Sequence, residues 1–202
     1  TTLDRSSSYA IFKDREARIW VTSMSGVNLY NREEDNFTRI RDLGSWIMDI
    51  DQDADGNIWF SSQGNGLFKY DPDKQEWTNY VHSSAPGALI NDQVNCVLID
   101  GNGEMWIGTM NGLCKYNAKE DQFELIPLDI PSRNICAIIE DQRVLWLTTT
   151  KGLVRYVPGE SCQVFTRSDG LQSEQFLVNA ALKASDGKIY IGSVNGFNAF
   201  YP

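Results

Sequence analysis

The sequence predicts an all-β fold, a β-propeller of four-stranded antiparallel blades, and three observations predict it. A tryptophan or tyrosine follows a short apolar run, a glycine comes six or seven residues later, and an aromatic residue follows that glycine by four. This unit occurs five times, its first aromatics 39, 47, 40 and 44 residues apart, a period typical of stacked supersecondary units. Helical periodicity is absent between the copies. The five copies are Trp20/Gly26/Tyr30, Trp59/Gly66/Tyr70, Trp106/Gly112/Tyr116, Trp146/Gly152/Tyr156 and Tyr190/Gly196/Phe200.

The third copy shows how one unit is expected to fold. Gly101-Asn102-Gly103 and Asn111-Gly112 favour tight turns, because these residues tolerate positive φ. The segments between the turns are short, apolar and rich in β-branched residues, or alternate polar with apolar residues, as strands do. The expected strands are 94–100, 104–109, 113–116 and 122–126.

The strands of one unit differ in polarity, which indicates a radial arrangement. A first strand such as Ile135–Ile139 is entirely apolar, whereas a fourth strand such as Glu76–Tyr80 alternates. The first strand is therefore expected at the hub and the fourth at the rim. We expect one propeller segment over 1–202, with nineteen strands because the fifth blade ends after its third. Its blades span roughly 8–40, 46–80, 93–126, 134–166 and 176–202, as part of a larger, seven-bladed type of ring.

Composition excludes several classes of function. The net charge of −9 argues against a nucleic-acid partner, which requires clustered Lys and Arg. No apolar run approaches the roughly 18 residues of a membrane span, so no membrane contact is expected from this segment. The chain begins at Thr1 and is expected to be a piece of a longer protein. Its four cysteines include no CxxC pair, and Cys96 and Cys136 occupy equivalent slots, which favours buried free thiols.

The repeat resembles the two-component regulator propeller repeat. The resemblance rests on DADGNIWFSSQGNGLFKY (53–70), DGNGEMWIGTMNGLCKY (100–116), DQRVLWLTTTKGLVRY (141–156) and the final segment 169–202. The first copy is weakest, because DREAR (14–18) replaces the glycine turn. The resemblance implies a periplasmic sensor region of a hybrid histidine kinase of Bacteroidetes type, which responds to glycans. It also implies an adjacent β-sandwich domain and a second sensor subunit as partners, with the kinase outside these residues.

Motifs for covalent chemistry or metal binding are weak. His82 is the only histidine and lies in a polar loop, without a GxSxG motif. Asp51-x-Asp53-x-Asp55-Gly56 matches half of a calcium loop, but Ser62 stands where a bidentate glutamate is needed. The Asp-Gly-x-x-Trp pattern is one residue shorter than the aspartate box of sialidases. We therefore expect no catalytic residue, metal or cofactor in this segment.

Binding is expected on the loops between blades, which share one face with the turns between second and third strands. Polar groups and an aromatic platform there suit an oligosaccharide. Trp46 stands out because no other copy has tryptophan at that place. Two alternatives remain open: a protein-interaction propeller without a small-molecule site, and a propeller lyase or glycosidase. The candidate binding residues are Arg41, Trp46, His82, Asn91, Asp92, Arg133, Arg167, Gln172 and Glu174.

Overall fold

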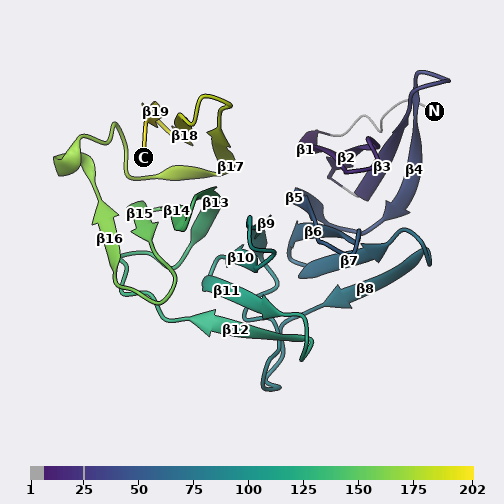
Figure 1. The fold of residues 1–202 in the computed structure, drawn as a ribbon, viewed down its shortest axis with the longest axis horizontal. Coiled ribbons are helices and arrows are strands. Elements are labelled where there is room, and N and C mark those ends of the chain that lie inside the picture. The colour runs from purple at the N-terminus through teal and green to yellow at the C-terminus, as the bar shows by residue number, and fades with distance from the viewer. Residues whose placement is uncertain (1–6, 25) are drawn as a thin grey trace.

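The computed structural model describes residues 7–24 and 26–202, and over these residues it contains nineteen strands and one short 3₁₀ helix. The strands form four four-stranded antiparallel sheets and one three-stranded sheet, which confirms the predicted propeller blades (Figure 1). The fifth blade has three strands, as expected, and residues 1–6 at the N-terminus lie outside the described part.

Each blade is a meander whose strands pair in sequence order. Blade 1 contains β1 (Ser8–Lys13), β2 (Ile19–Ser23), β3 (Gly26–Asn31) and β4 (Asn36–Asp42). Blade 2 contains β5 (Trp46–Gln52), β6 (Ile58–Gln63), β7 (Leu67–Asp71) and β8 (Glu76–Tyr80). Blade 3 contains β9 (Val94–Ile99), β10 (Met105–Thr109), β11 (Gly112–Asn117) and β12 (Gln122–Ile126). Blade 4 contains β13 (Ile135–Asp141), β14 (Val144–Thr149), β15 (Gly152–Tyr156) and β16 (Cys162–Phe165). Blade 5 contains β17 (Phe176–Lys183), β18 (Ile189–Ser193) and β19 (Gly196–Phe200), and follows the 3₁₀ helix η1 (Arg167–Asp169).

The first strand of every blade lies at the hub, as the apolar first strands predict (Figure 1). Neighbouring first strands contact one another from β1 through β5, β9 and β13 to β17, and β17 also contacts β5 and β9 across the centre. The ring is open between blade 1 and blade 5 (Figure 1). The five blades therefore form an arc around a narrow hub.

The core consists of four apolar clusters, each shared by two neighbouring blades. The first aromatic of a repeat lies between its own blade and the next, and Trp20, Trp59 and Trp106 are each only 1% exposed. The regular tryptophans therefore fill the space between blades. The cysteines are free, and Cys96, Cys114 and Cys136 are buried while Cys162 is half-buried.

The aspartate of the repeat holds the turn between the first and second strands. Asp100 accepts hydrogen bonds from the backbone N–H groups of Asn102 and Glu104, both at 2.9 Å, and from Trp106 Nε1, also at 2.9 Å. One carboxylate thus closes the turn and satisfies a buried indole. The same Asp-to-indole bond occurs as Asp14–Trp20 at 2.7 Å and Asp53–Trp59 at 2.7 Å.

This turn accounts for the pattern that resembles half of a calcium loop. The Asp53 carboxylate accepts bonds from the backbone of Asp55, from the backbone and side chain of Asn57, and from Trp59. Its oxygens are therefore used by the hairpin itself. Within the described ranges no group of three or more His, Cys, Asp or Glu side chains is placed to hold a metal ion.

Blade 1 uses alanine where the other turns of this kind use glycine. Ala17 has φ 63°, and its N–H donates to the Asp14 carbonyl at 3.0 Å, as Gly103 with φ 80° donates to Asp100 at 2.8 Å. A residue with a Cβ is strained by about 1–2 kcal/mol in this left-handed conformation.

We therefore expect Ala17→Gly to raise the free energy of unfolding by about 1 kcal/mol, measured by urea denaturation. Gly103→Ala is the matched control and should lower it by a similar amount. A Cβ at Gly103 would have no atom within 4 Å, so only the backbone would be strained. If both substitutions change the free energy of unfolding in the same direction, Ala17 is not strained by its left-handed conformation.

No helix among the described residues has the length and apolar character needed to cross a membrane.

Candidate functional site

The channel face of the propeller is the side on which the first strands begin and the second strands end. The pairing of Trp46 with Gln63, at the start of β5 and the end of β6, places both on this face. The same holds for Ile135 with Thr149 in blade 4. The loops that connect successive blades therefore reach the hub on this face, together with the turns between second and third strands.

An aromatic platform stands on the channel face between blades 1 and 2. Trp46 and Tyr9 are stacked, with ring centroids 6.0 Å apart and planes 18° from parallel. Trp46 is 46% exposed, in contrast to the buried tryptophans of the repeat. The Trp46 ring, which lies nearly parallel to the half-buried Tyr9 ring, offers a surface on which the apolar face of a sugar can stack.

A row of amide side chains crosses the hub beside this platform. Gln63, which pairs with Trp46, has Nε2 3.5 Å from Asn95 Oδ1. Asn95, 1% exposed, donates from Nδ2 to Asn134 Oδ1 at 2.8 Å and to the Ile135 carbonyl at 2.7 Å. These bonds link blades 2, 3 and 4. The half-buried outer amides, Gln63 and Asn134, retain further hydrogen-bonding capacity for a bound molecule.

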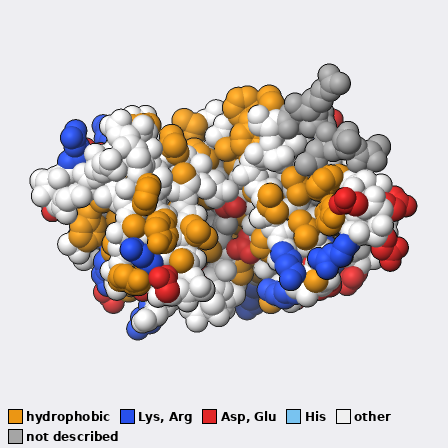
Figure 2. All heavy atoms as spheres, turned by 90° about the horizontal axis from the view of Figure 1, so that it is seen from above, with side chains coloured by type: hydrophobic (Ala, Val, Ile, Leu, Met, Phe, Trp, Pro, Cys, Tyr) orange, Lys and Arg blue, Asp and Glu red, His pale blue; other side chains and the backbone are white. Residues whose placement is uncertain are grey.

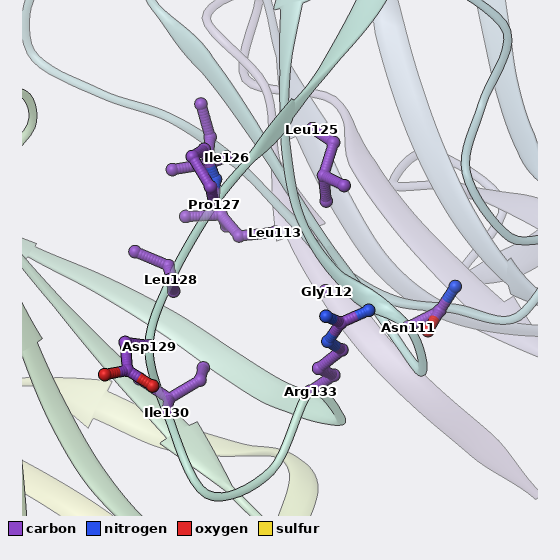
Figure 3. A pocket seen from close by; sticks show the side chains of 10 residues that line it. All are labelled: Asn111, Gly112, Leu113, Leu125, Ile126, Pro127, Leu128, Asp129, Ile130 and Arg133. Carbon is purple, nitrogen blue, oxygen red and sulfur yellow. The ribbon is translucent and has the colours of Figure 1, made fainter.

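A hollow of about 380 Å³ lies where blade 3 meets the loop to blade 4 (Figure 3). Its lining is largely apolar, including Leu113, Leu125 and Leu128. Figure 3 shows the Arg133 side chain beside the turn at Gly112, with Asp129 on the far side of the loop. Arg133, which lines the hollow, directly precedes Asn134 of the amide row in the chain.

Of the nine predicted site residues, Trp46 forms part of the aromatic platform and Arg133 lines the hollow. Arg41, on β4, instead lies over the Trp77 ring at 5.2 Å, between the outer strands of blades 1 and 2. That guanidinium packs on a neighbouring blade, so it contributes to the contact between blades.

The long loop between blades 2 and 3 uses its predicted residues to hold its own shape. His82 Nδ1 lies 2.9 Å from the Leu89 carbonyl, and the His82 N–H donates to Asp92 at 2.6 Å. Asn91 accepts the Gln93 N–H at 2.7 Å. The Asp92 carbonyl accepts the N–H groups of Gly64 and Gly66.

The loop into blade 5 behaves in the same way. Glu174 accepts the Arg167 N–H at 3.0 Å through its side chain and the Gly152 N–H at 2.8 Å through its carbonyl. The Gln172 N–H donates to Asn198 at 3.2 Å. These bonds order the loop, and the Glu174 carbonyl joins it to Gly152 at the turn between β14 and β15, on the channel face.

Four residues of this surface were not among the predicted ones: Tyr9, Gln63, Asn95 and Asn134. The prediction considered the loops between blades, whereas these residues lie within strands or at their ends. The sequence feature that could have identified two of them is an amide side chain next to the start of an apolar hub strand. Asn95 is the second residue of β9, and Asn134 directly precedes β13.

Two carboxylates lie below the face at the hub. Burial raises the pKa of Asp49 to about 7, although the backbone N–H groups of Val97 and Ile50 and the Asn179 amide bond to it and act in the opposite direction. Burial also raises the pKa of Asp51, which accepts the Ile99 N–H at 2.6 Å. Asp49 of blade 2 thus joins Val97 of blade 3 to Asn179 of blade 5. Asn179 also donates to the Met48 carbonyl at 2.8 Å.

Fold and surface together define the chain as a five-bladed β-propeller with an aromatic and amide-lined channel face. Residues 88–111 match the family model described as two component regulator propeller, which confirms the resemblance seen in the repeats. The match covers the first two strands of blade 3, from the end of the long loop to the turn at Asn111.

One curated relative is similar over most of this chain. Histidine kinase P4 of Formosa agariphila is 28% identical over an alignment 217 positions long, which covers 79% of this chain and 16% of that protein. The chain therefore spans about a sixth of the length of this curated relative.

Solved structures share the fold. The extracellular domain assigned to the hybrid two component system BT3049 of B. thetaiotaomicron superposes with a TM-score of 0.85 at 24% identity, covering 98% of this chain and 28% of that one. Virginiamycin B lyase from Staphylococcus aureus superposes with a TM-score of 0.74 at 14% identity, covering 100% of this chain and 72% of the lyase. At these identities the superpositions establish the fold alone.

Proposed function

We propose that this chain is the ligand-sensing propeller segment of a periplasmic two-component sensor, and that it binds an oligosaccharide on its channel face. The observation that carries the proposal is the exposed Trp46 ring, stacked on Tyr9 beside the Gln63–Asn95–Asn134 row. Support comes from the match to the two component regulator propeller family and from the histidine kinase relative.

The arrangement suggests how a sugar chain would lie. One ring stacks on Trp46, and hydroxyl groups of the next units meet the amides of Gln63 and Asn134. Arg133 and the hollow beside it receive the far end of the chain. Stacking plus a few fixed polar groups is the usual composition of such sites.

Binding would act on the rest of the sensor through blade contacts. The amide row joins blades 2, 3 and 4, so a ligand that holds the row also holds these blades relative to one another. We propose that this changes how the propeller packs against an adjacent β-sandwich domain or a second sensor subunit. Only a ligand with different affinity for the two arrangements can shift them.

An enzymatic role is not proposed. The single histidine lies in a loop whose bonds it completes, with His82 Nδ1 on the Leu89 carbonyl. The surface described above offers stacking and hydrogen bonds, which bind a ligand without reacting with it.

We expect Trp46→Ala to weaken oligosaccharide binding by about tenfold, because loss of an aromatic contact costs roughly 1–1.5 kcal/mol. The measurement is calorimetric titration with a panel of neutral oligosaccharides, followed by the affinity of each variant for the ligand found. Gln63→Ala should weaken the same ligand by a smaller factor.

Tyr201→Ala is the control, since Tyr201 is 65% exposed and bonds to Asp186 at the turn between β17 and β18, on the opposite face. It should leave affinity unchanged. If no oligosaccharide binds, or if Trp46→Ala binds as the parent chain does, the proposal fails and a protein-interaction propeller becomes the better account.

A further inference from the structure

The first strand of blade 5 departs from the pattern of the other hub strands. In blades 2, 3 and 4 the pairing of the first with the second strand slips by one residue, and the extra residues are Met48, Asn95 and Cys136. In blade 5 the four residues Leu177–Ala180 lie opposite the single residue Gly192. Extra residues bend a strand and redirect its side chains. We call residues 177–180 the hub arch.

The hub arch is bonded to blade 2, which is not a neighbour of blade 5. Asn179 donates from Nδ2 to the Met48 carbonyl at 2.8 Å and to Asp49 Oδ1 at 3.2 Å. Met48 is the extra residue of β5, so its carbonyl is not used in pairing with β6. The irregular parts of two hub strands therefore meet, and one side chain joins them.

The bond made by Asn95 in blade 3 shows what a permanent contact of this kind looks like. Asn95 is also an extra residue, and it donates to the Ile135 carbonyl of the next blade at 2.7 Å. Asn95 is buried, and blades 3 and 4 also share an apolar cluster. Asn179 is half-buried, and the apolar cluster of blade 5 is shared with blade 4. Water can therefore reach and replace the bonds of Asn179 more readily than those of Asn95.

The backbone of the hub arch is held in an unfavourable conformation. Asn179 has φ 53°, in the left-handed region, although it lies within a strand. Such a conformation persists where surrounding contacts impose it. Breaking the two bonds of Asn179 would let the arch return to an extended conformation. The other described residues that carry a side chain and have positive φ lie in or beside turns: Ala17, Asp35, Gln75, Asp121 and Gln142.

We propose that the hub arch is a releasable contact that controls the position of blade 5. While Asn179 is bonded to Met48 and Asp49, blade 5 is held against blade 2 across the hub. When these bonds break, blade 5 is free to move relative to blades 1–4.

The surroundings of blade 5 leave room for this movement. The ring is open between blades 5 and 1 (Figure 1). Figure 2 looks into this opening and shows hydrophobic side chains on both sides, with acidic groups between them. Release would also affect the channel face, because Met48 follows Trp46 by two residues in β5. The proposal rests on contacts within this chain and does not depend on which ligand the channel face binds.

The test is hydrogen exchange of the whole chain, followed by mass spectrometry, for the parent and for Asn179→Gly. Glycine adopts the left-handed conformation freely, so this substitution removes the two bonds without adding backbone strain. We expect exchange of the β17 amides to become about tenfold faster, whereas exchange in β14 of blade 4 stays unchanged. Asn179→Asp preserves side-chain size but places a second carboxylate beside Asp49, so it should accelerate β17 by at least as much.

Leu182→Ala is the matched control, because Leu182 lies on the same strand outside the arch and is 62% exposed. It should leave exchange of the arch unchanged. Three results would overturn the proposal. Unchanged β17 exchange in both Asn179 variants would show that this side chain does not hold the arch. Equal acceleration in β17 and β14 would show that its bonds support the whole fold. Equally slow exchange of both strands in the parent chain would show that the arch opens only on global unfolding.

Discussion

Asp100→Ala should lower the free energy of unfolding by about 4 kcal/mol, measured by urea denaturation at pH 7. The substitution removes three hydrogen bonds to an ionised acceptor, each worth about 1.5–3 kcal/mol, and partial rehydration of the turn offsets part of the loss. It also leaves the Trp106 indole N–H buried without an acceptor, since Trp106 is 1% exposed.

Two further variants separate the indole bond from the turn. Asp100→Ala should cost about 1–2 kcal/mol less when Trp106 is already Phe, because no N–H is then left unsatisfied. Asp141→Ala is the control for loss of a carboxylate from a neighbouring hairpin. Asp141 bonds to Lys183 in a partly exposed ion pair, so a change below about 1 kcal/mol is expected. A loss below 1 kcal/mol for Asp100→Ala would show that the repeat aspartate is dispensable.

Blade 4 shows the result of lacking this bond. The pairing of β13 with β14 continues up to Asp141 and Val144. Blade 4 therefore lacks the longer turn that Asp100 closes between β9 and β10. Among the described residues, Trp146 Nε1 has no hydrogen-bond partner, and Trp146 is 7% exposed rather than 1%. The comparison within one chain supports the role assigned to Asp100.

Stability should fall by up to about 4 kcal/mol as the pH rises from 4 to above 7, because of Asp49. Burial raises the pKa of this group to about 7 in the folded chain, against 3.8 for the ordinary carboxyl. A raised carboxyl pKa stabilises the fold fully below pH 3.8, and this stabilisation is lost as the pH rises through 7. Burial also raises the pKa of Asp51, so this group too makes stability fall as the pH rises.

The measurement is urea denaturation at pH 5 and pH 8, for the parent chain and for Asp49→Asn. Most of the difference between the two pH values should disappear in the variant. Carboxyls with lowered pKa, such as Asp71, Asp121 and Asp186, affect stability below about pH 4 and stay ionised over this range. An unchanged pH dependence in Asp49→Asn would show that another group is responsible.

The candidate site illustrates the limit of prediction from loops. Trp46 is predictable because it breaks the repeat, and it is exposed on the channel face. The sequence also predicts Arg41 and His82, because their loops reach that face. Their partners, the Trp77 ring and the Leu89 carbonyl, follow from how each loop packs, which residue type alone does not reveal.

The sequence by itself determined the strands, their order and their division into blades. These depend on local chemistry that repeats every forty or so residues: apolar runs, glycine turns, and an aspartate six residues before an indole. Only the tertiary structure decided which blade contacts which across the hub. The Tyr9–Trp46 stack, the Gln63–Asn95–Asn134 row and the contact of Asn179 with Asp49 join residues from different blades. Their geometry depends on blade spacing and on the shift of register near Met48, where a one-residue slip changes the face each side chain occupies.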